Sequence, residues 1–403
     1  MPKKLDLRAS DLLGFSRLAN GLVEQVTGVV EELHNKIAFT SSDLSAPSTQ
    51  TFATGITAMV YRSIRGVTGL VGSSLLASER LLAPANEKRL SSRREATVAA
   101  VNGVFGDYLV QTNNPLAISM SLRRRGRPLQ IERNALQRTL RPTAKLLLLA
   151  HGLCLNDLQW KRKGHDHGAA LARDLGYTPL YLHYNSGLHV SENGKLFSAL
   201  LETLVEEWPL PLKEMVILGH SMGGLVARSA YYYGKEEGHR WPSHLRRLIF
   251  LGTPHHGAPL ERLGNWADTT LESHPYAAPF ARLGKIRSAG ITDMRYGNLL
   301  EADWKGRDRF APTIDLRKPV PLPGDVQSYA IAATRQPDVG SGPDMLGDGL
   351  VTLDSALGRH PNPEMSLGFA DSRTWIACGM NHWDLLSHQA VYQHLCSWLA
   401  SEP

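Results

Sequence analysis

The chain has 403 residues, of which 42% are hydrophobic and 20% charged. This composition excludes a disordered or fibrous protein, and the length predicts two or three globular units. The cysteines, Cys154, Cys378 and Cys396, are odd in number, so we expect no disulfide framework and a reducing compartment.

The net charge of +6 is unevenly distributed along the chain. Residues 1–150 carry 20 basic and 11 acidic side chains, a net +9, whereas residues 151–403 carry 24 and 27, a net −3. Such a basic segment forms either a solvated face or a contact with an anionic partner such as a membrane surface. Nucleic acid is not expected, because no basic motif with interleaved aromatic residues accompanies the charges. Charged residues between Asp6 and Arg17 interrupt any apolar leader, so the sequence predicts a cytoplasmic protein, with peripheral membrane association left open.

The first part of the chain has a helical pattern. Apolar residues recur at spacings of three and four between Phe15 and Ile37 and between Ile56 and Leu75, which predicts two amphipathic helices. A third stripe runs through Val98, Val101, Phe105 and Leu109. We interpret residues 1–115 as an N-terminal helical region that either packs on the rest of the chain or contacts a membrane peripherally through its helices.

From residue 116 to 403, short apolar strands alternate with helices, which predicts a mostly parallel sheet with helices on both faces. A hairpin is expected over 118–131. Strands are then expected at 145–150, 179–184, 215–218, 248–251, 326–333 and 374–377, and helices at 168–175, 196–208, 223–233 and 389–399. An insertion at 258–323, with apolar residues from Leu263 to Met294, is predicted either to form a cap over a site or to pack on the body.

The stretch Gly219-His-Ser-Met-Gly223 lies between a predicted strand and a predicted helix. Glycines on both sides permit a tight turn that exposes the hydroxyl of Ser221, and the helix behind it directs its N-terminal amides at the same place. Ser221 is therefore predicted to be a nucleophile, and a structural turn is the alternative. His220, beside it, is predicted to bind substrate together with His151.

The turn His151-Gly152 ends an earlier predicted strand. It can direct the backbone N–H of Leu153 at a reacting carbonyl oxygen, and with the N–H of Met222 it forms a two-donor oxyanion hole. Cys154 is an alternative nucleophile, but no paired histidine signature accompanies it.

An acid and a base are expected in that order on loops that follow late strands. Asp348 follows the strand predicted at 326–333, and His382 follows the strand predicted at 374–377. Asp348 is expected to hold His382 in the tautomer that accepts the Ser221 proton. The competing acid is Asp354, and the competing bases are His360, His388 and His394.

Four motifs occur in order: GHSMGG from Gly219, LGTPHHG from Leu251, GDGLV from Gly347 and NHWD from Asn381. Together they resemble the bacterial triacylglycerol lipases and esterases of the α/β-hydrolase superfamily and, more faintly, GPI inositol deacylases. The resemblance covers residues 144–403.

The resemblance implies an α/β-hydrolase fold carrying an N-terminal helical extension and a cap insertion. It implies a serine hydrolase that cleaves a small-molecule or lipid carboxylic ester through an acyl-enzyme and a Ser221–His382–Asp348 triad, with Leu153 and Met222 as oxyanion hole and no cofactor. Acyl transfer and thioester or amide cleavage by the same triad stay open, and so does a membrane-associated lipid-binding protein. The oligomeric state is also left open.

The chain departs from this family in its N-terminal helical part and in having no secretion signal. In some relatives a calcium ion lies near the catalytic histidine, where Asp384 stands here, but its partners are not identifiable. The pairs His165/His167 and His255/His256 lack the spacing of a zinc site, so no metal is expected.

Overall fold

The computed structural model describes residues 92–258, 287–309, 314–338 and 347–400, together with residues 8, 10–11 and 13–18 near the N-terminus. The helices predicted at 15–37 and 56–75 lie almost wholly outside the described residues. The described residues belong to two compact units, and helix α3 (Ser92–Gln111) contributes to both. Glu95–Tyr108 belong to the larger unit with Ile118 and everything after it, so the boundary that we place at residue 115 stays a prediction.

The smaller unit is described only where the N-terminal residues meet 109–117. Residues 13–18 are helical. Asp11 accepts a hydrogen bond of 2.6 Å from Arg94 Nη2, and Asn114 Nδ2 donates to the carbonyl oxygen of Gly14 at 3.0 Å. These bonds hold the described N-terminal residues within this unit.

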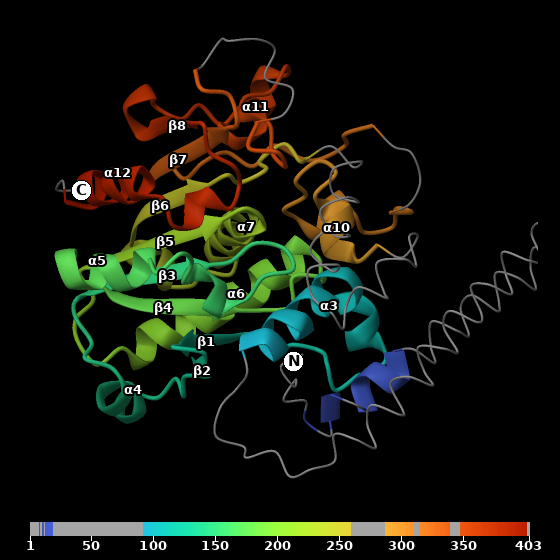
Figure 1. Ribbon diagram of the computed structural model, residues 1–403, viewed down its shortest axis with the longest axis vertical. Coiled ribbons are helices and arrows are strands. Elements are labelled where there is room, and N and C mark those ends of the chain that lie inside the picture. The colour runs from blue at the N-terminus through green and yellow to red at the C-terminus, as the bar shows by residue number, and fades with distance from the viewer. Residues whose placement is uncertain are drawn as a thin grey trace, which may run out of the picture. The chain divides into compact units, whose positions relative to one another are not determined.

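In the larger unit the described strands form one eight-stranded sheet in the order β2-β1-β4-β3-β5-β6-β7-β8 (Figure 1). The strands from β3 to β8 pair in parallel, while β1 pairs antiparallel with both β2 and β4. Their bounds are β1 Ser121–Arg124, β2 Arg127–Pro128, β3 Lys145–Ala150, β4 Thr178–His183, β5 Glu214–His220, β6 Leu245–Leu251, β7 Gln327–Thr334 and β8 Thr374–Cys378. The predicted mostly parallel sheet, and with it the α/β-hydrolase fold, is confirmed.

Helices cover both faces of this sheet. Leu149 and Ile249 face a core that includes Leu171 of α5 and Leu395 of α12. The neighbouring Phe250 points to the opposite face, where α6, α7 and the short α11 pack, because successive side chains of a strand alternate. The helix bounds are α4 Arg133–Thr139, α5 His167–Leu175, α6 Val190–Glu207, α7 Met222–Glu236, α10 Ala289–Asp293, α11 Leu353–Ala356 and α12 Gln389–Ala400. The 3-10 helices are η1 Asp157–Trp160, η2 Trp241–His244, η3 Glu301–Asp303, η4 Pro363–Met365, η5 Asp371–Arg373 and η6 Asp384–Leu386.

The central strands are apolar because helices bury them from both sides. In β3 the four leucines from Leu146 to Leu149 are 0% exposed. Burying one such side chain contributes about 1.5–3 kcal/mol, so these runs fix the strands in the middle of the sheet. None of the described helices is both long and apolar enough to cross a membrane.

The described end of the predicted cap insertion is fastened to the body. Ser288 Oγ donates to the carbonyl oxygen of Gly103 at 2.6 Å, and Asp293 accepts from the backbone N–H of Val190 at 2.8 Å. The backbone N–H of Ala258 donates to the carbonyl oxygen of Met294 at 2.8 Å, and Met294 is buried. The apolar residues from Leu263 to Ile286 lie outside the described residues, so their placement over a site stays a prediction.

Candidate active site

Ser221 is the single residue between strand β5 and helix α7, and its backbone has a positive φ of 53°, with ψ −128°. A side chain at Gly219 would lie 2.5 Å from the Cα of Gly224, and one at Gly223 would lie 2.2 Å from the carbonyl oxygen of Ala150. Only glycine fits at either position, so the tight turn requires both residues. A non-glycine residue held at positive φ stores strain, and such residues cluster at functional sites.

Asp348 and His382 form a buried pair. Their Oδ2 and Nδ1 atoms are 2.6 Å apart, and the side chains are 1% and 2% exposed. The other oxygen of Asp348 accepts from the backbone N–H groups of Leu350 at 2.9 Å and Val351 at 2.8 Å. With the Nδ1 proton engaged by the carboxylate, Nε2 of His382 is left as the acceptor for another proton.

The ends of several strands bring this pair and Ser221 together. The backbone N–H of Ser221 donates to the carbonyl oxygen of Leu251 at 2.8 Å. A Cβ on the next residue, Gly252, would lie 3.1 Å from both Asp348 Oδ2 and His382 Nδ1. The imidazole of His220 lies 4.6 Å from that of His382, between ring centroids. The three predicted residues therefore gather at the carboxyl end of the sheet, where parallel strands place their functional loops.

The two predicted oxyanion donors come from two different turns. Met222 directly follows Ser221, and Leu153 belongs to the turn after β3. A Cβ on Gly152, just before Leu153, would lie 3.0 Å from the Cβ of Ser221. Both residues are buried: Leu153 is 2% exposed and Met222 is 0% exposed. The role of their backbone N–H groups as an oxyanion hole stays a prediction.

His151 and His220 are buried and uncharged. Burial lowers the pKa of His151 to about 3, and its ring stacks on Tyr184 at 4.3 Å. Burial and the neighbouring His382 lower the pKa of His220, whose Nε2 lies 3.2 Å from the carbonyl oxygen of His382. Both imidazoles contact the loops of the site, and their role in substrate binding stays a prediction.

The competing residues lie elsewhere. Asp354 is exposed in the first turn of α11 and lies 3.8 Å from Arg359. The competing bases have other neighbours: His360 contacts His256, His388 accepts from the backbone N–H of Ala390, and His394 stacks on Trp375. Cys154 is fully buried, which raises the pKa of its thiol and disfavours a thiolate nucleophile.

Asp384, the residue at the position of a calcium ligand in some relatives, pairs with a cation of the chain. Its Oδ1 lies 2.9 Å from Nζ of Lys163, and its Oδ2 accepts from the backbone N–H of Asn381 at 3.2 Å. His165 and His167 are hydrogen-bonded to each other at 2.9 Å. Within the described parts of the chain, no group of three or more His, Cys, Asp or Glu side chains has the arrangement of a metal site.

Three residues around the site were missed from the sequence. Gly252 is part of the LGTPHHG motif but has no chemical group that marks a role. Tyr184 donates from its hydroxyl to the carbonyl oxygen of His151 at 2.7 Å. Arg228 of α7 is buried beside His255 Nδ1 at 3.2 Å and also donates to the carbonyl oxygen of Val320, and burial lowers its pKa to about 9. These contacts join residues far apart in sequence, which no spacing rule reveals.

Comparison with known families gives one family match. Residues 187–315 match the model described as a PGAP1-like alpha/beta domain. This range contains Ser221 and ends before Asp348 and His382. A search of curated proteins gives no significant match.

Solved structures similar to the chain include two lipases and an esterase. The mature form of a Bacillus licheniformis lipase is 16% identical over 70% of this chain and 98% of its own, with a TM-score of 0.42. Lipase B of Aspergillus fumigatus is 12% identical over 68% of this chain and 59% of its own, with a TM-score of 0.38. An esterase of Pyrococcus furiosus is 13% identical over 64% and 79%, with a TM-score of 0.35.

Proposed function

We propose that this chain, which has the α/β-hydrolase fold, is a carboxylic ester hydrolase of the lipase and esterase type, with Ser221, His382 and Asp348 as its catalytic triad. The observation that carries the proposal is the buried 2.6 Å hydrogen bond between Asp348 and His382, next to a serine held at positive φ. A neutral imidazole held in this way has one nitrogen free to take a proton from a hydroxyl.

In the proposed reaction the Oγ of Ser221 attacks the acyl carbonyl carbon while Nε2 of His382 takes the hydroxyl proton. The N–H groups of Leu153 and Met222 donate to the oxygen that becomes negatively charged. His382 then gives the proton to the leaving alcohol, and an acyl-enzyme remains. Water attacks this ester, again through His382, and releases the free acid and Ser221.

The proposal is tested first at the nucleophile. Ser221→Ala is expected to abolish both fluorophosphonate labelling and the hydrolysis of p-nitrophenyl acyl esters, since loss of a triad serine costs on the order of 10⁶ in kcat. Ser397→Ala, at an exposed serine of α12, is the matched control and should keep both activities. Full labelling and turnover by folded Ser221→Ala would remove the proposed function.

A second pair of variants tests the acid. Asp348→Asn should lower kcat by about 10⁴, because an amide cannot hold His382 in the required tautomer. Asp354→Asn removes the competing, exposed carboxylate and should leave kcat unchanged. The reverse result would assign the acid to Asp354.

The proposed substrate is a small-molecule or lipid ester. A series of esters from acetate to palmitate would give the preferred acyl length, and product analysis with an added alcohol separates hydrolysis from acyl transfer. Free acid as the only product would exclude the transferase alternative.

A further inference from the structure

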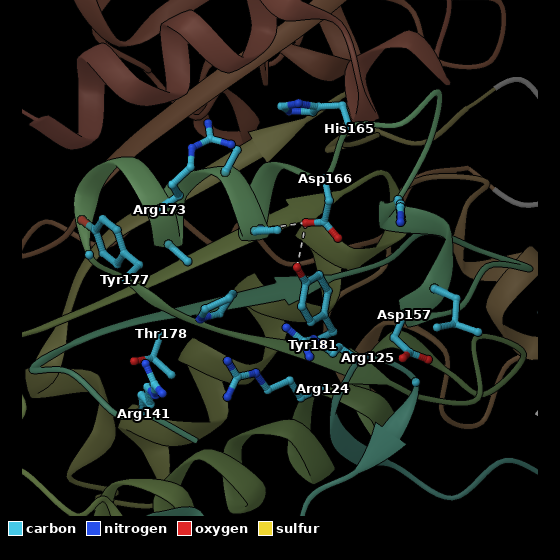
Figure 2. Close-up of a pocket in the computed structure, with 18 of the residues that line it drawn as sticks. Arg124, Arg125, Arg141, Asp157, His165, Asp166, Arg173, Tyr177, Thr178 and Tyr181 are labelled. Carbon is cyan, nitrogen blue, oxygen red and sulfur yellow. Dashed lines mark hydrogen bonds between the residues drawn. The ribbon is translucent and has the colours of Figure 1, made fainter. Parts of the chain in front are cut away.

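A large cavity of the larger unit lies apart from the proposed triad. It has a volume of about 840 Å³ and is lined by the β1–β2 turn, by residues before β3, by the β3–α5 segment and by the first half of β4 (Figure 2). None of Ser221, Asp348 or His382 lines it. Small-molecule sites have volumes of roughly 300–1,000 Å³, so the cavity has the size of a ligand site.

The cavity is strongly basic. Five of its lining residues are cationic, against two acids; the cations are Arg124, Arg125, Arg141, Lys161 and Arg173. Figure 2 shows Arg124 and Arg141 on the same side of the cavity as Thr178, and Arg173 on the side of α5. The excess positive charge is therefore contributed by several separate segments of the chain.

The two acids of the cavity are already engaged. Asp166 accepts from the hydroxyl of Tyr181 at 2.7 Å and from the backbone N–H of Ala169 at 2.9 Å, as the dashed lines in Figure 2 mark. Asp157 accepts from Arg123 at 3.2 Å and also faces His183. Neither carboxylate forms an ion pair with a cation that lines the cavity.

Within the described residues, most of these cations have no acid partner. Arg173 pairs with Asp174 at 2.6 Å, outside the cavity lining. Arg124 donates to the carbonyl oxygen of Thr139 at 3.3 Å. Among the described residues, Arg125, Arg141 and Lys161 form no ion pair within 4 Å.

Arg124 is the central member of this group, because it is only partly exposed. Burial and the adjacent charge of Arg125 lower its pKa, and the neighbouring Tyr181 opposes this shift in part. Its neighbour on the strand, Arg123, is matched by both Glu95 and Asp157. The two adjacent arginines of β1 thus differ. The charge of Arg123 is neutralised by two carboxylates, whereas Arg124 lines the cavity and forms no ion pair with a described carboxylate.

The turn that presents these arginines is itself unusual. Arg125 and Gly126 have φ angles of 51° and 77°, and Arg124 pairs with Arg127 across the turn. A two-residue turn with both central residues at positive φ favours Asn, Asp or Gly at its first position, and arginine carries a steric cost there. The chain nevertheless places a cation at this position, at the edge of the cavity.

We propose that this cavity binds a ligand bearing phosphate groups, at a site separate from the ester-cleaving centre. A guanidinium group can donate two parallel hydrogen bonds to the oxygens of one phosphate. Several cations around one cavity therefore favour a ligand with more than one negative charge. The ligand is either a soluble phosphorylated molecule or the phosphate head group of a lipid. The inference is independent of the proposed hydrolase activity, because its test measures binding.

The test uses the full chain at low salt. Binding of inorganic pyrophosphate and of ATP is measured by calorimetry, and co-sedimentation is measured with phosphatidylcholine vesicles with and without phosphatidic acid. Arg124→Gln/Arg141→Gln is expected to weaken binding at least about tenfold, because each lost charge-assisted bond to phosphate weakens binding substantially. Arg246→Gln/Arg359→Gln removes the same charge at exposed positions outside the cavity and is expected to bind as the wild type does.

The outcomes separate the two ligand sources. Loss of pyrophosphate or ATP binding in the cavity variant alone supports a soluble ligand, and loss of vesicle binding alone supports a lipid head group. Equal binding by wild type and both double variants, or no binding of any probe, overturns the proposal. Arg141→Gln/Lys161→Gln, at two exposed positions, carries the same test if the first variant does not fold.

Discussion

Gly252 offers a test of the site that leaves every proposed catalytic group in place. It has φ 56°, and a methyl group at its Cα would lie 3.1 Å from Asp348 Oδ2, 3.1 Å from His382 Nδ1 and 2.8 Å from Leu385 Cδ1. Leu385 is fully buried and must also shift, while the hydrogen-bonded pair is held by the backbone N–H groups around Asp348. Gly252→Ala therefore presses on the pair itself.

The magnitude follows from this geometry. A contact of 3.1 Å requires the neighbouring atoms to move by a few tenths of an ångström. Since a misplacement of about 1 Å costs on the order of a hundredfold in rate, we expect a loss of about tenfold in kcat, with KM nearly unchanged. The alanine also takes a left-handed conformation, which costs about 1–2 kcal/mol of stability.

Gly368→Ala is the matched control. Gly368 has φ 62°, and a Cβ there would meet no atom within 4 Å. It should lose similar stability in urea unfolding and keep the wild-type kcat for p-nitrophenyl esters. A wild-type kcat in folded Gly252→Ala, or an equal loss in both variants, would refute the reasoning that the position of the Asp348–His382 pair limits the reaction.

Other predictions concern stability and metals. Glu214→Gln should lower the free energy of unfolding by about 3 kcal/mol, because it leaves the buried guanidinium of Arg247 without its carboxylate; a change below 1 kcal/mol in urea titration would show that the pair is unimportant. Lys163→Met removes the partner of Asp384 in an exposed ion pair, so we expect the free energy of unfolding to change by at most about 1 kcal/mol. Treatment of the wild type with a chelator should leave hydrolysis unchanged. Loss of activity on chelation would point to a metal at this carboxylate. Burial lowers the pKa of His167 to about 4, below its unfolded value of 6.5, so the unfolded chain binds the proton first as pH falls. The free energy of unfolding should therefore drop by about 1.4 kcal/mol per pH unit between these two values. His167→Gln should reduce this slope, and an unchanged slope would contradict the assignment.

The sequence was most informative where burial imposes a simple pattern. The strands from β3 onward were predictable because their side chains are apolar on both faces. Helix α4 was missed because only Ala135 and Leu136 in it are buried, which gives no periodic stripe. Helix α6 begins at Val190, six residues before its predicted start, since its first turns contain small and polar residues such as Gly194, which packs against Ser229 of α7.

In the candidate site, too, residues in local motifs were predictable and contacts made only by the fold were not. Asp348 and His382 could be named because each stands in a short motif after a strand, and the structure joins them by a hydrogen bond. The contacts of Gly252 and Arg228 arise only from the fold. Neither a glycine nor an arginine stands in a local sequence pattern that predicts which distant residues it will contact.

The fastening of the insertion on both sides has a consequence for redesign. Ser288 is tied to the body of the protein by its hydrogen bond to Gly103. Ala258 is tied to Met294, whose neighbour Asp293 accepts from Val190, so both described ends of the insertion are held in place. A doubling in length between two fixed points adds only about 0.6 kcal/mol of closure entropy. The length of the insertion can therefore be varied between these two ends at a small entropic cost.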